Sequence, residues 1–196
     1  MLHFKFFESE NDSKQLLVML HGFISDSTTY DSHVAYFSQH VNVLTIDLPG
    51  HGQDTSDMQD TWDFPYIAHA LDEVLSQFDT YDVYLLGYSM GGRVALYYAL
   101  YGSVALRGLL LESTSAGIQD EADKVERVQV DAARAKVLEI AGLEIFVNDW
   151  EKLPLFRSQY GLDAEVRKAI RANRMSQNPV RLAKALRDYG TGNMPN

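Results

Sequence analysis

The sequence predicts an α/β protein with a mostly parallel sheet that is flanked by helices and carries a helical cap. Up to about residue 118, short apolar runs alternate with amphipathic segments, a pattern typical of a parallel sheet covered on both faces. The charge balance then changes. Residues 1–118 hold 4 basic and 15 acidic residues, whereas residues 119–196 hold 13 basic and 12 acidic residues. Strand signals also become rare. We therefore expect a core in residues 1–118, a cap in 119–190 and a linker in 191–196.

The expected elements follow one another in a regular order. An edge strand and four further apolar runs are expected as strands at Leu2–Phe7, Gln15–Leu20, Asn42–Ile46, Asp82–Leu86 and Leu106–Leu111. Core segments with helical spacing lie between them at Ser27–Gln39, Ile67–Phe78 and Gly91–Tyr101. The cap segments with helical spacing and charged faces are Gln119–Leu138, Asp163–Met175 and Val180–Asp188. These lengths suit strands and helices of an α/β sheet protein.

Composition excludes several classes of protein. A content of 46% hydrophobic and 22% charged residues is typical of a globular chain. The net charge of −10 disfavours binding to nucleic acid or to an anionic membrane. The sequence has no cysteine, which excludes a disulfide framework, a thiolate metal site and a cysteine nucleophile. Without a visible signal peptide or membrane span, we expect a cytoplasmic protein.

The strongest motif is the pentapeptide Gly87–Gly91, which reads Gly-Tyr-Ser-Met-Gly and has Ser89 at its centre. It follows an apolar strand and opens a helical segment, as the G-x-S-x-G pattern of a nucleophile elbow requires. In such an elbow the serine lies on a strained turn, and the start of the helix presents free N–H groups. The alternative is a glycine-serine turn without chemistry. The context favours Ser89 as a catalytic serine.

Two further loops follow neighbouring strands. The loop at His21-Gly22-Phe23 lies where an elbow fold places one oxyanion-hole donor. We expect the two donors to be the backbone N–H groups of Phe23 and Met90. His21 could be mistaken for a general base, but its place in this loop favours a structural role. The turn at Asp47–Gly52 is expected to shape its loop rather than to react.

Arginine and aromatic residues indicate the type of ligand. Arg93 lies four residues after Ser89, and the cap adds Arg127, Trp150 and Arg174. Since guanidinium groups pair with carboxylates, several arginines near one serine predict a small di- or tricarboxylate. For Arg127 and Arg174 a solvated helix face remains the alternative. We expect solvated positions for the other cap arginines considered, Arg134, Arg167, Arg171, Arg181 and Arg187.

The order and spacing of these motifs resemble the α/β-hydrolase fold, whose triad runs Ser, then Asp or Glu, then His along the chain. All six histidines precede Ser89, the last being His69, and the final strands that would carry the acid and the histidine are also not found. Two explanations are open: a piece of a longer enzyme, which the intact elbow favours, or a shortened protein that has lost its triad. For such a piece on its own we expect very low activity, because an unassisted serine is a weak nucleophile or base.

More specifically, the elbow with Gly92 and Arg93, the Asp47–Gly52 turn, the segment Phe146–Trp150 and the arginine positions are similar to one enzyme family. These are the 2-succinyl-6-hydroxy-2,4-cyclohexadiene-1-carboxylate synthases of menaquinone biosynthesis, as found in Gram-positive bacteria and especially in staphylococci. The resemblance covers essentially the whole chain. It implies a lyase, without cofactor or metal, that eliminates pyruvate from 2-succinyl-5-enolpyruvyl-6-hydroxy-3-cyclohexene-1-carboxylate.

The resemblance also implies roles for individual residues. Ser89 would act as the base once a histidine draws off its proton, and Phe23 and Met90 would supply the oxyanion N–H groups. The carboxylates and the ring of the substrate would be held by Tyr88, Arg93, Arg127, Trp150 and Arg174. Two other functions stay open: a carboxylic-ester hydrolase, and a non-catalytic truncated binding module. The oligomeric state is open too, with association through an exposed sheet edge as one expectation.

Overall fold

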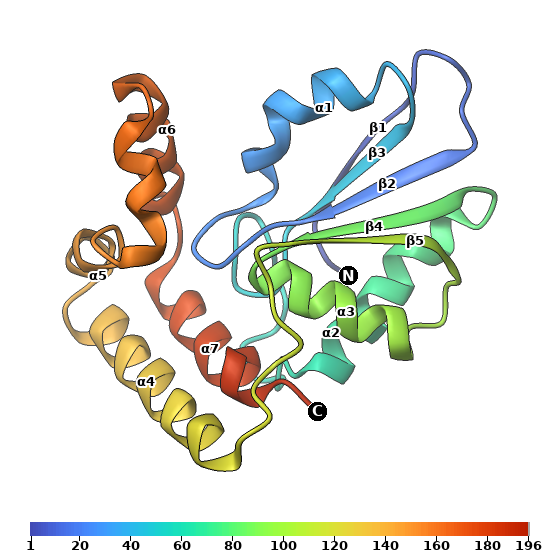
Figure 1. Ribbon diagram of the computed structural model, residues 1–196. Helices are drawn as coiled ribbons and strands as arrows, with labels where there is room; N and C mark the ends of the chain where they lie inside the picture. The colour runs from blue at the N-terminus through green and yellow to red at the C-terminus, as the bar shows by residue number, and fades with distance from the viewer. Residues whose placement is uncertain (196) are drawn as a thin grey trace.

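A five-stranded sheet forms the centre of the protein in the computed structural model, which describes residues 1–195 (Figure 1). The strand order is β1-β3-β2-β4-β5. The edge strand β1 (Phe4–Phe7) runs antiparallel to β3 (Asn42–Ile46), whereas β2 (Gln15–Leu20), β4 (Asp82–Tyr88) and β5 (Leu106–Glu112) pair in parallel. The predicted α/β class with a mostly parallel sheet is confirmed.

Helices cover both faces of this sheet. One face packs on α1 (Asp31–Phe37) and on the 3₁₀ turn Ser27–Tyr30 before it, and the other on α2 (Phe64–Leu75) and α3 (Met90–Tyr101). Strand β2 contributes to both cores, because its side chains alternate between the faces. Leu17 and Met19 join the first core, and the second receives Leu16, Val18 and Leu20.

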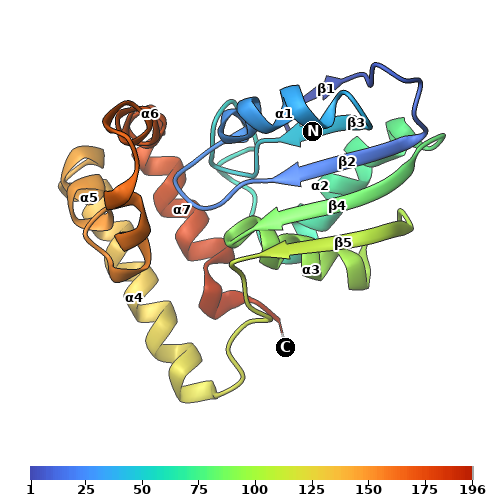
Figure 2. The same cartoon turned by 45° about the horizontal axis from the view of Figure 1, so that its top comes forward.

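The remaining helices form a cap beyond the carboxyl ends of β2, β4 and β5 (Figure 2). They are α4 (Glu121–Ile140), α5 (Leu143–Trp150), α6 (Ala164–Met175) and α7 (Pro179–Tyr189), with a 3₁₀ segment at Pro154–Gly161. Helix α7 connects the two layers. Its Leu182 and Leu186 pack in the cap, while its Ala185 and Tyr189 belong to the main core. The cap is therefore fastened over the end of the sheet where ligands of parallel α/β proteins bind.

Two parts of the cap were not expected from the sequence. Helix α5 and the 3₁₀ segment after it are short, and Gly142 (φ 85°) separates α5 from α4. Helix α2 also begins earlier than expected, because the side chain of Asp63 accepts a hydrogen bond from the N–H of Tyr66 at 2.8 Å and caps the helix. Among residues 1–195, no helix is long and apolar enough to cross a membrane.

Candidate active site

Ser89 lies at the turn between β4 and α3 in a conformation that side chains rarely adopt. Its φ is 52° and its ψ is −111°, outside the favoured regions for a non-glycine residue. The surrounding backbone holds it there. Its N–H donates to the carbonyl of Glu112 at 2.9 Å, and its own carbonyl accepts from Thr114 Oγ1 at 2.7 Å. The predicted elbow is thus a strained turn fixed from the neighbouring strand β5.

The glycines of the motif allow backbone segments to approach one another. A Cβ atom on Gly87 would lie 2.4 Å from the carbonyl oxygen of Gly91. A Cβ atom on Gly91 would lie 2.3 Å from the carbonyl oxygen of Leu20, at the end of β2. Both distances are far too short for real atoms. The motif therefore needs glycine on either side of the serine so that β2, β4 and α3 can meet.

Ser89 opens onto a cavity of about 410 Å³ between the elbow and the cap. The cavity brings together seven of the eight site residues that the sequence predicts. These are Phe23, Tyr88, Ser89, Met90, Arg93, Arg127 and Trp150. Their positions in the chain range from the loop after β2 to the end of α5, so the fold and not the chain order assembles them. The eighth, Arg174, does not line this cavity.

Two backbone N–H groups at the cavity are available to a ligand. Met90 is the first residue of α3, and the N–H of a first helical residue has no partner inside the helix. Within residues 1–195, the N–H of Phe23 makes no backbone hydrogen bond outside the regular elements. Both residues line the Ser89 cavity. They are therefore the candidate donors of an oxyanion hole.

Arg93 places a buried cation at the wall of the Ser89 cavity. Its Nε atom is buried and has no hydrogen-bond partner within residues 1–195. Burial, and then the nearby charge of Arg127, lowers the pKa of Arg93 to about 10. The side chain still carries its positive charge at neutral pH. A buried charge of this kind is costly unless an anion pairs with it.

Arg127 and Arg134 share one carboxylate beside the same cavity. Arg127 Nε lies 3.0 Å from both carboxylate oxygens of Asp131, and Arg134 Nη1 lies 3.2 Å from Oδ1. The guanidinium of Arg134 also lies 5.3 Å from the ring centre of Trp150. The expectation that Arg134 is merely solvated is therefore wrong. Its spacing from Arg127 and Asp131 on α4 was the signal that could have revealed it, because the three lie on one helix face.

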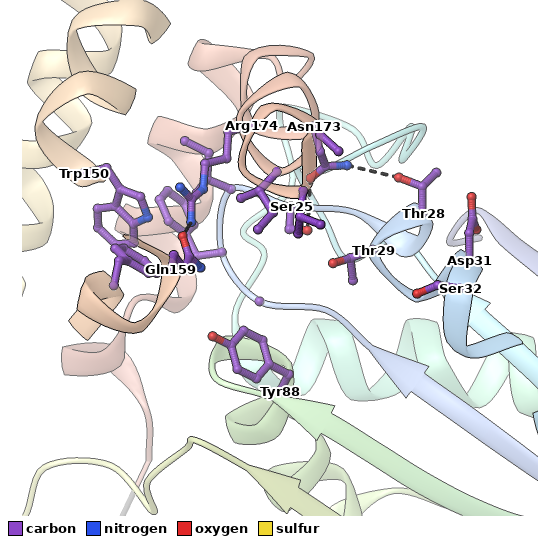
Figure 3. A pocket seen from close by; sticks show the side chains of 17 residues that line it. Ser25, Thr28, Thr29, Asp31, Ser32, Tyr88, Trp150, Gln159, Asn173 and Arg174 are labelled. Carbon is purple, nitrogen blue, oxygen red and sulfur yellow. Dashed lines mark hydrogen bonds between the residues drawn. The ribbon is translucent and has the colours of Figure 1, made fainter. Parts of the chain in front are cut away.

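Arg174 faces a neighbouring pocket of about 530 Å³ (Figure 3). It is buried and donates to Glu151 Oε1 and to Gln159 Oε1, both at 3.1 Å. This pocket shares four of its walls with the Ser89 cavity, namely Phe23, Tyr88, Trp150 and Phe156. Figure 3 shows Tyr88 at the end of β4, across the pocket from Gln159 and Arg174. The structure thus places Arg174 next to the Ser89 cavity and not in it.

The histidines near the loops have structural positions. His21 is buried, accepts from the N–H of Leu48 at 3.0 Å and contacts the carbonyl of Gly22 at 2.8 Å. Burial lowers the pKa of His21, and burial lowers the pKa of His51 to about 3, so both rings are neutral. None of the histidines lines the Ser89 cavity in the described part of the chain. The structural role expected for His21 agrees with these contacts.

The loop that follows β2 is tied to the cap by a hydrogen-bond network. Asp26 accepts from Gln177 Nε2 at 2.8 Å and from Asn173 Nδ2 at 2.9 Å, and the N–H of Gly52 donates to Gln177 Oε1 at 2.9 Å. Asp47 accepts two backbone N–H groups from the adjoining loops, in agreement with the loop-shaping role expected for its turn. Within residues 1–195, no His, Asp and Glu side chains form a metal-binding group.

Comparison with known proteins gives consistent relatives. Residues 17–192 match the family described as Alpha/beta hydrolase family. The structure of MenH from S. aureus is 57% identical to this chain and has a TM-score of 0.98. The match covers 100% of this chain and 74% of that chain. A protein of Bacillus subtilis (strain 168), provisionally named as a 2-succinyl-6-hydroxy-2,4-cyclohexadiene-1-carboxylate synthase, is 32% identical over 94% of this chain and 67% of the relative. The Shigella dysenteriae serotype 1 (strain Sd197) protein of that name is 32% identical over 87% of this chain and 65% of the relative.

Proposed function

We infer the function from the family: the chain belongs to the 2-succinyl-6-hydroxy-2,4-cyclohexadiene-1-carboxylate synthases of the alpha/beta hydrolase family. We propose that its Ser89 site eliminates pyruvate from 2-succinyl-5-enolpyruvyl-6-hydroxy-3-cyclohexene-1-carboxylate in menaquinone biosynthesis. One observation carries the proposal: the strained serine opens onto a cavity lined by Arg93, Arg127 and Arg134. Because the chain spans about two thirds of the Bacillus relative, the activity is proposed for a form as long as the relatives.

The charge of the cavity suits this substrate. By its name the substrate carries three carboxylates, one on the succinyl group, one on the enolpyruvyl group and one on the ring. Among residues 1–195, the cavity is lined by three guanidinium groups and one carboxylate, that of Asp131. Guanidinium–carboxylate pairs are strong when they are shielded from water. An esterase for simple acyl groups would instead favour an apolar acyl pocket, so the arginines support the lyase over that alternative.

The reaction follows from the difference between substrate and product. The proton on ring carbon 2 is removed, the double bond between carbons 3 and 4 shifts to carbons 2 and 3, and a second double bond forms between carbons 4 and 5. The bond from carbon 5 to the enolpyruvyl oxygen breaks, and the fragment leaves as the enolate of pyruvate, which takes up a proton on its methylene carbon to give pyruvate. In our proposal the Ser89 oxygen takes the proton, and the N–H groups of Phe23 and Met90 stabilise the negative charge that develops on the succinyl ketone.

The remaining roles are proposed on position. Tyr88 and Trp150 lie on the wall that the two pockets share, and in the proposal they contact the ring. Arg174 is paired with Glu151, and it would bind a carboxylate that reaches the neighbouring pocket. The partner is a small polycarboxylate and not nucleic acid, and we keep a cytoplasmic location as part of the proposal.

The general base needs a histidine that activates Ser89, and no histidine follows His69 in this sequence. We propose that residues beyond the cap supply it, as the family resemblance implies. A chimera tests this: the chain is continued with the C-terminal portion of the S. aureus relative. We expect pyruvate release by the chimera and almost none by the chain alone. Hydrolysis of p-nitrophenyl esters without pyruvate release would favour the ester hydrolase instead.

A further inference from the structure

A buried carboxylate lies within the arginine-lined cavity, and the proposed reaction gives it no task. Asp131 is 2% exposed. It occupies the face of α4 that also carries Arg127 and Arg134, one turn before it and one turn after it. Arg127 Nε donates to both of its carboxylate oxygens, and Arg134 Nη1 donates to Oδ1. One acidic side chain thus contacts two of the three cavity arginines.

The position of this carboxylate is tightly constrained. A Cβ atom on Gly190 would lie 2.7 Å from Asp131 Oδ2 and 2.4 Å from the carbonyl oxygen of Leu186. The end of α7 is therefore pressed against the carboxylate with no space between them. Further along α4, Ala135 and Leu138 are fully buried. The carboxylate of Asp131 is consequently held in place, and the two arginine side chains bond to it.

The arginines keep donors free for a ligand. Arg127 uses only Nε and Arg134 only Nη1 in their bonds to Asp131. Within residues 1–195, this leaves both terminal nitrogens of Arg127 without a partner. Two terminal nitrogens of a guanidinium match the two oxygens of a carboxylate. The guanidinium of Arg134 also lies over the ring of Trp150.

We propose that Asp131 is a positioning residue and Arg134 a substrate-binding residue: Asp131 holds Arg127 and Arg134 as a two-guanidinium clamp for one carboxylate of the ligand. Arg93 binds a second carboxylate elsewhere in the cavity. The inference rests on the proposed function, since it takes the ligand to be a polycarboxylate. Asp131 itself does not touch the ligand and acts through the two arginines.

A simpler electrostatic role for Asp131 predicts the opposite result. If Asp131 merely competed with the ligand for the arginines, removal of its charge would make the cavity more positive and tighten the binding of anions. If Asp131 positions the arginines, its removal frees two long side chains that repel each other, and ordering them again costs conformational entropy. Binding then weakens, although the cavity has gained positive charge.

The test uses Asp131→Asn in this chain and titration calorimetry with tricarballylate, a small tricarboxylate, at low ionic strength. We expect the Kd of tricarballylate to rise about tenfold or more. Glu139→Gln is the matched control, because Glu139 lies on the same helix and pairs with Arg187 away from the cavity. The control should keep the wild-type Kd. Thermal unfolding of both variants shows whether each is folded.

An unchanged or lower Kd for folded Asp131→Asn would overturn the inference. If that variant does not fold, Arg134→Gln tests the inference instead, since Arg134 is more exposed than Asp131. Arg134→Gln should weaken the binding of tricarballylate, and a wild-type Kd for this variant would overturn the inference. When Asp131→Asn and Arg134→Gln are combined, their losses of binding free energy should not add, because both residues act through one clamp. Arg93→Ala distinguishes a failure of the clamp from a failure of the proposed function. If tricarballylate binds this variant as tightly as the wild type, or does not bind the wild type at all, the polycarboxylate site itself is contradicted.

Discussion

The backbone N–H of Arg93 donates to the carbonyl oxygen of Ser89 at 3.2 Å. This bond belongs to the first turn of α3, so the turn that strains the serine also fixes the position of the arginine. A cation one helical turn from the serine is therefore a local consequence of the elbow. Arg127 and Arg134 reach the same cavity only because the cap folds over it.

Arg93→Ala should remove one charge-assisted pair with the substrate. We expect kcat/KM for pyruvate release by the chimera to fall by about 100-fold, since such a pair contributes about 2–3 kcal/mol. Arg107→Ala is the control, because exposed Arg107 pairs with Asp82 at the opposite end of β4. An enzyme indifferent to the loss of Arg93 would argue against a carboxylate at this position.

Ser89→Gly should separate stability from activity. Glycine adopts a positive φ without strain, so we expect the free energy of unfolding to rise by about 1 kcal/mol while pyruvate release by the chimera is lost. Ser103→Gly provides the contrast, because Ser103 has no positive φ and glycine there should lower stability. Urea unfolding of the chain measures both. A destabilised Ser89→Gly variant would show that the elbow stores no strain.

Gly91→Ala should damage the elbow by steric contact. The new methyl group would meet the carbonyl of Leu20, and a clash with backbone of this kind costs about 1–3 kcal/mol or more. Gly161→Ala is the matched control, because a Cβ atom there meets nothing within 4 Å. Denaturant midpoints compare the two. Equal midpoints would mean that β2 and α3 are free to move apart.

Acid should destabilise the chain through His51. Its pKa falls from 6.5 to about 3 on folding, so between these values the unfolded state binds more protons than the folded state. Stability is therefore full above pH 6.5 and is lost as the pH falls, by about 2 kcal/mol at pH 5. Urea unfolding at pH 7 and pH 5 measures this. His51→Gln should show a smaller loss on acidification, and an unchanged loss would remove His51 as its source.

Local patterns were enough to predict the elbow and most of the sheet. The strands Gln15–Leu20 and Asn42–Ile46 have the predicted bounds, because each is a buried run that ends at a clear turn. Ser89 was predictable for the same reason: the strand, the two glycines and the helix are all neighbours in sequence. These features depend on residues close to one another along the chain.

Long-range contacts account for what the sequence did not predict. The spacing of Arg134 from Arg127 and Asp131 places the three on one face of α4, but only the packing of α4 against α7 and α5 turns that face toward the cavity. Arg174 was grouped with the Ser89 arginines, but its bond to Glu151 holds it at the neighbouring pocket. A charge pair between separate segments of the cap leaves no periodic signal in a single sequence.

The most direct measurement is the rate of pyruvate release from the enolpyruvyl substrate by the chimera, with and without the change Ser89→Ala. The proposed mechanism predicts rapid release by the parent chimera and a loss of nearly all of it on removing one hydroxyl, with substrate binding retained. Pyruvate release that persists after Ser89→Ala would contradict the assignment of Ser89 as the base.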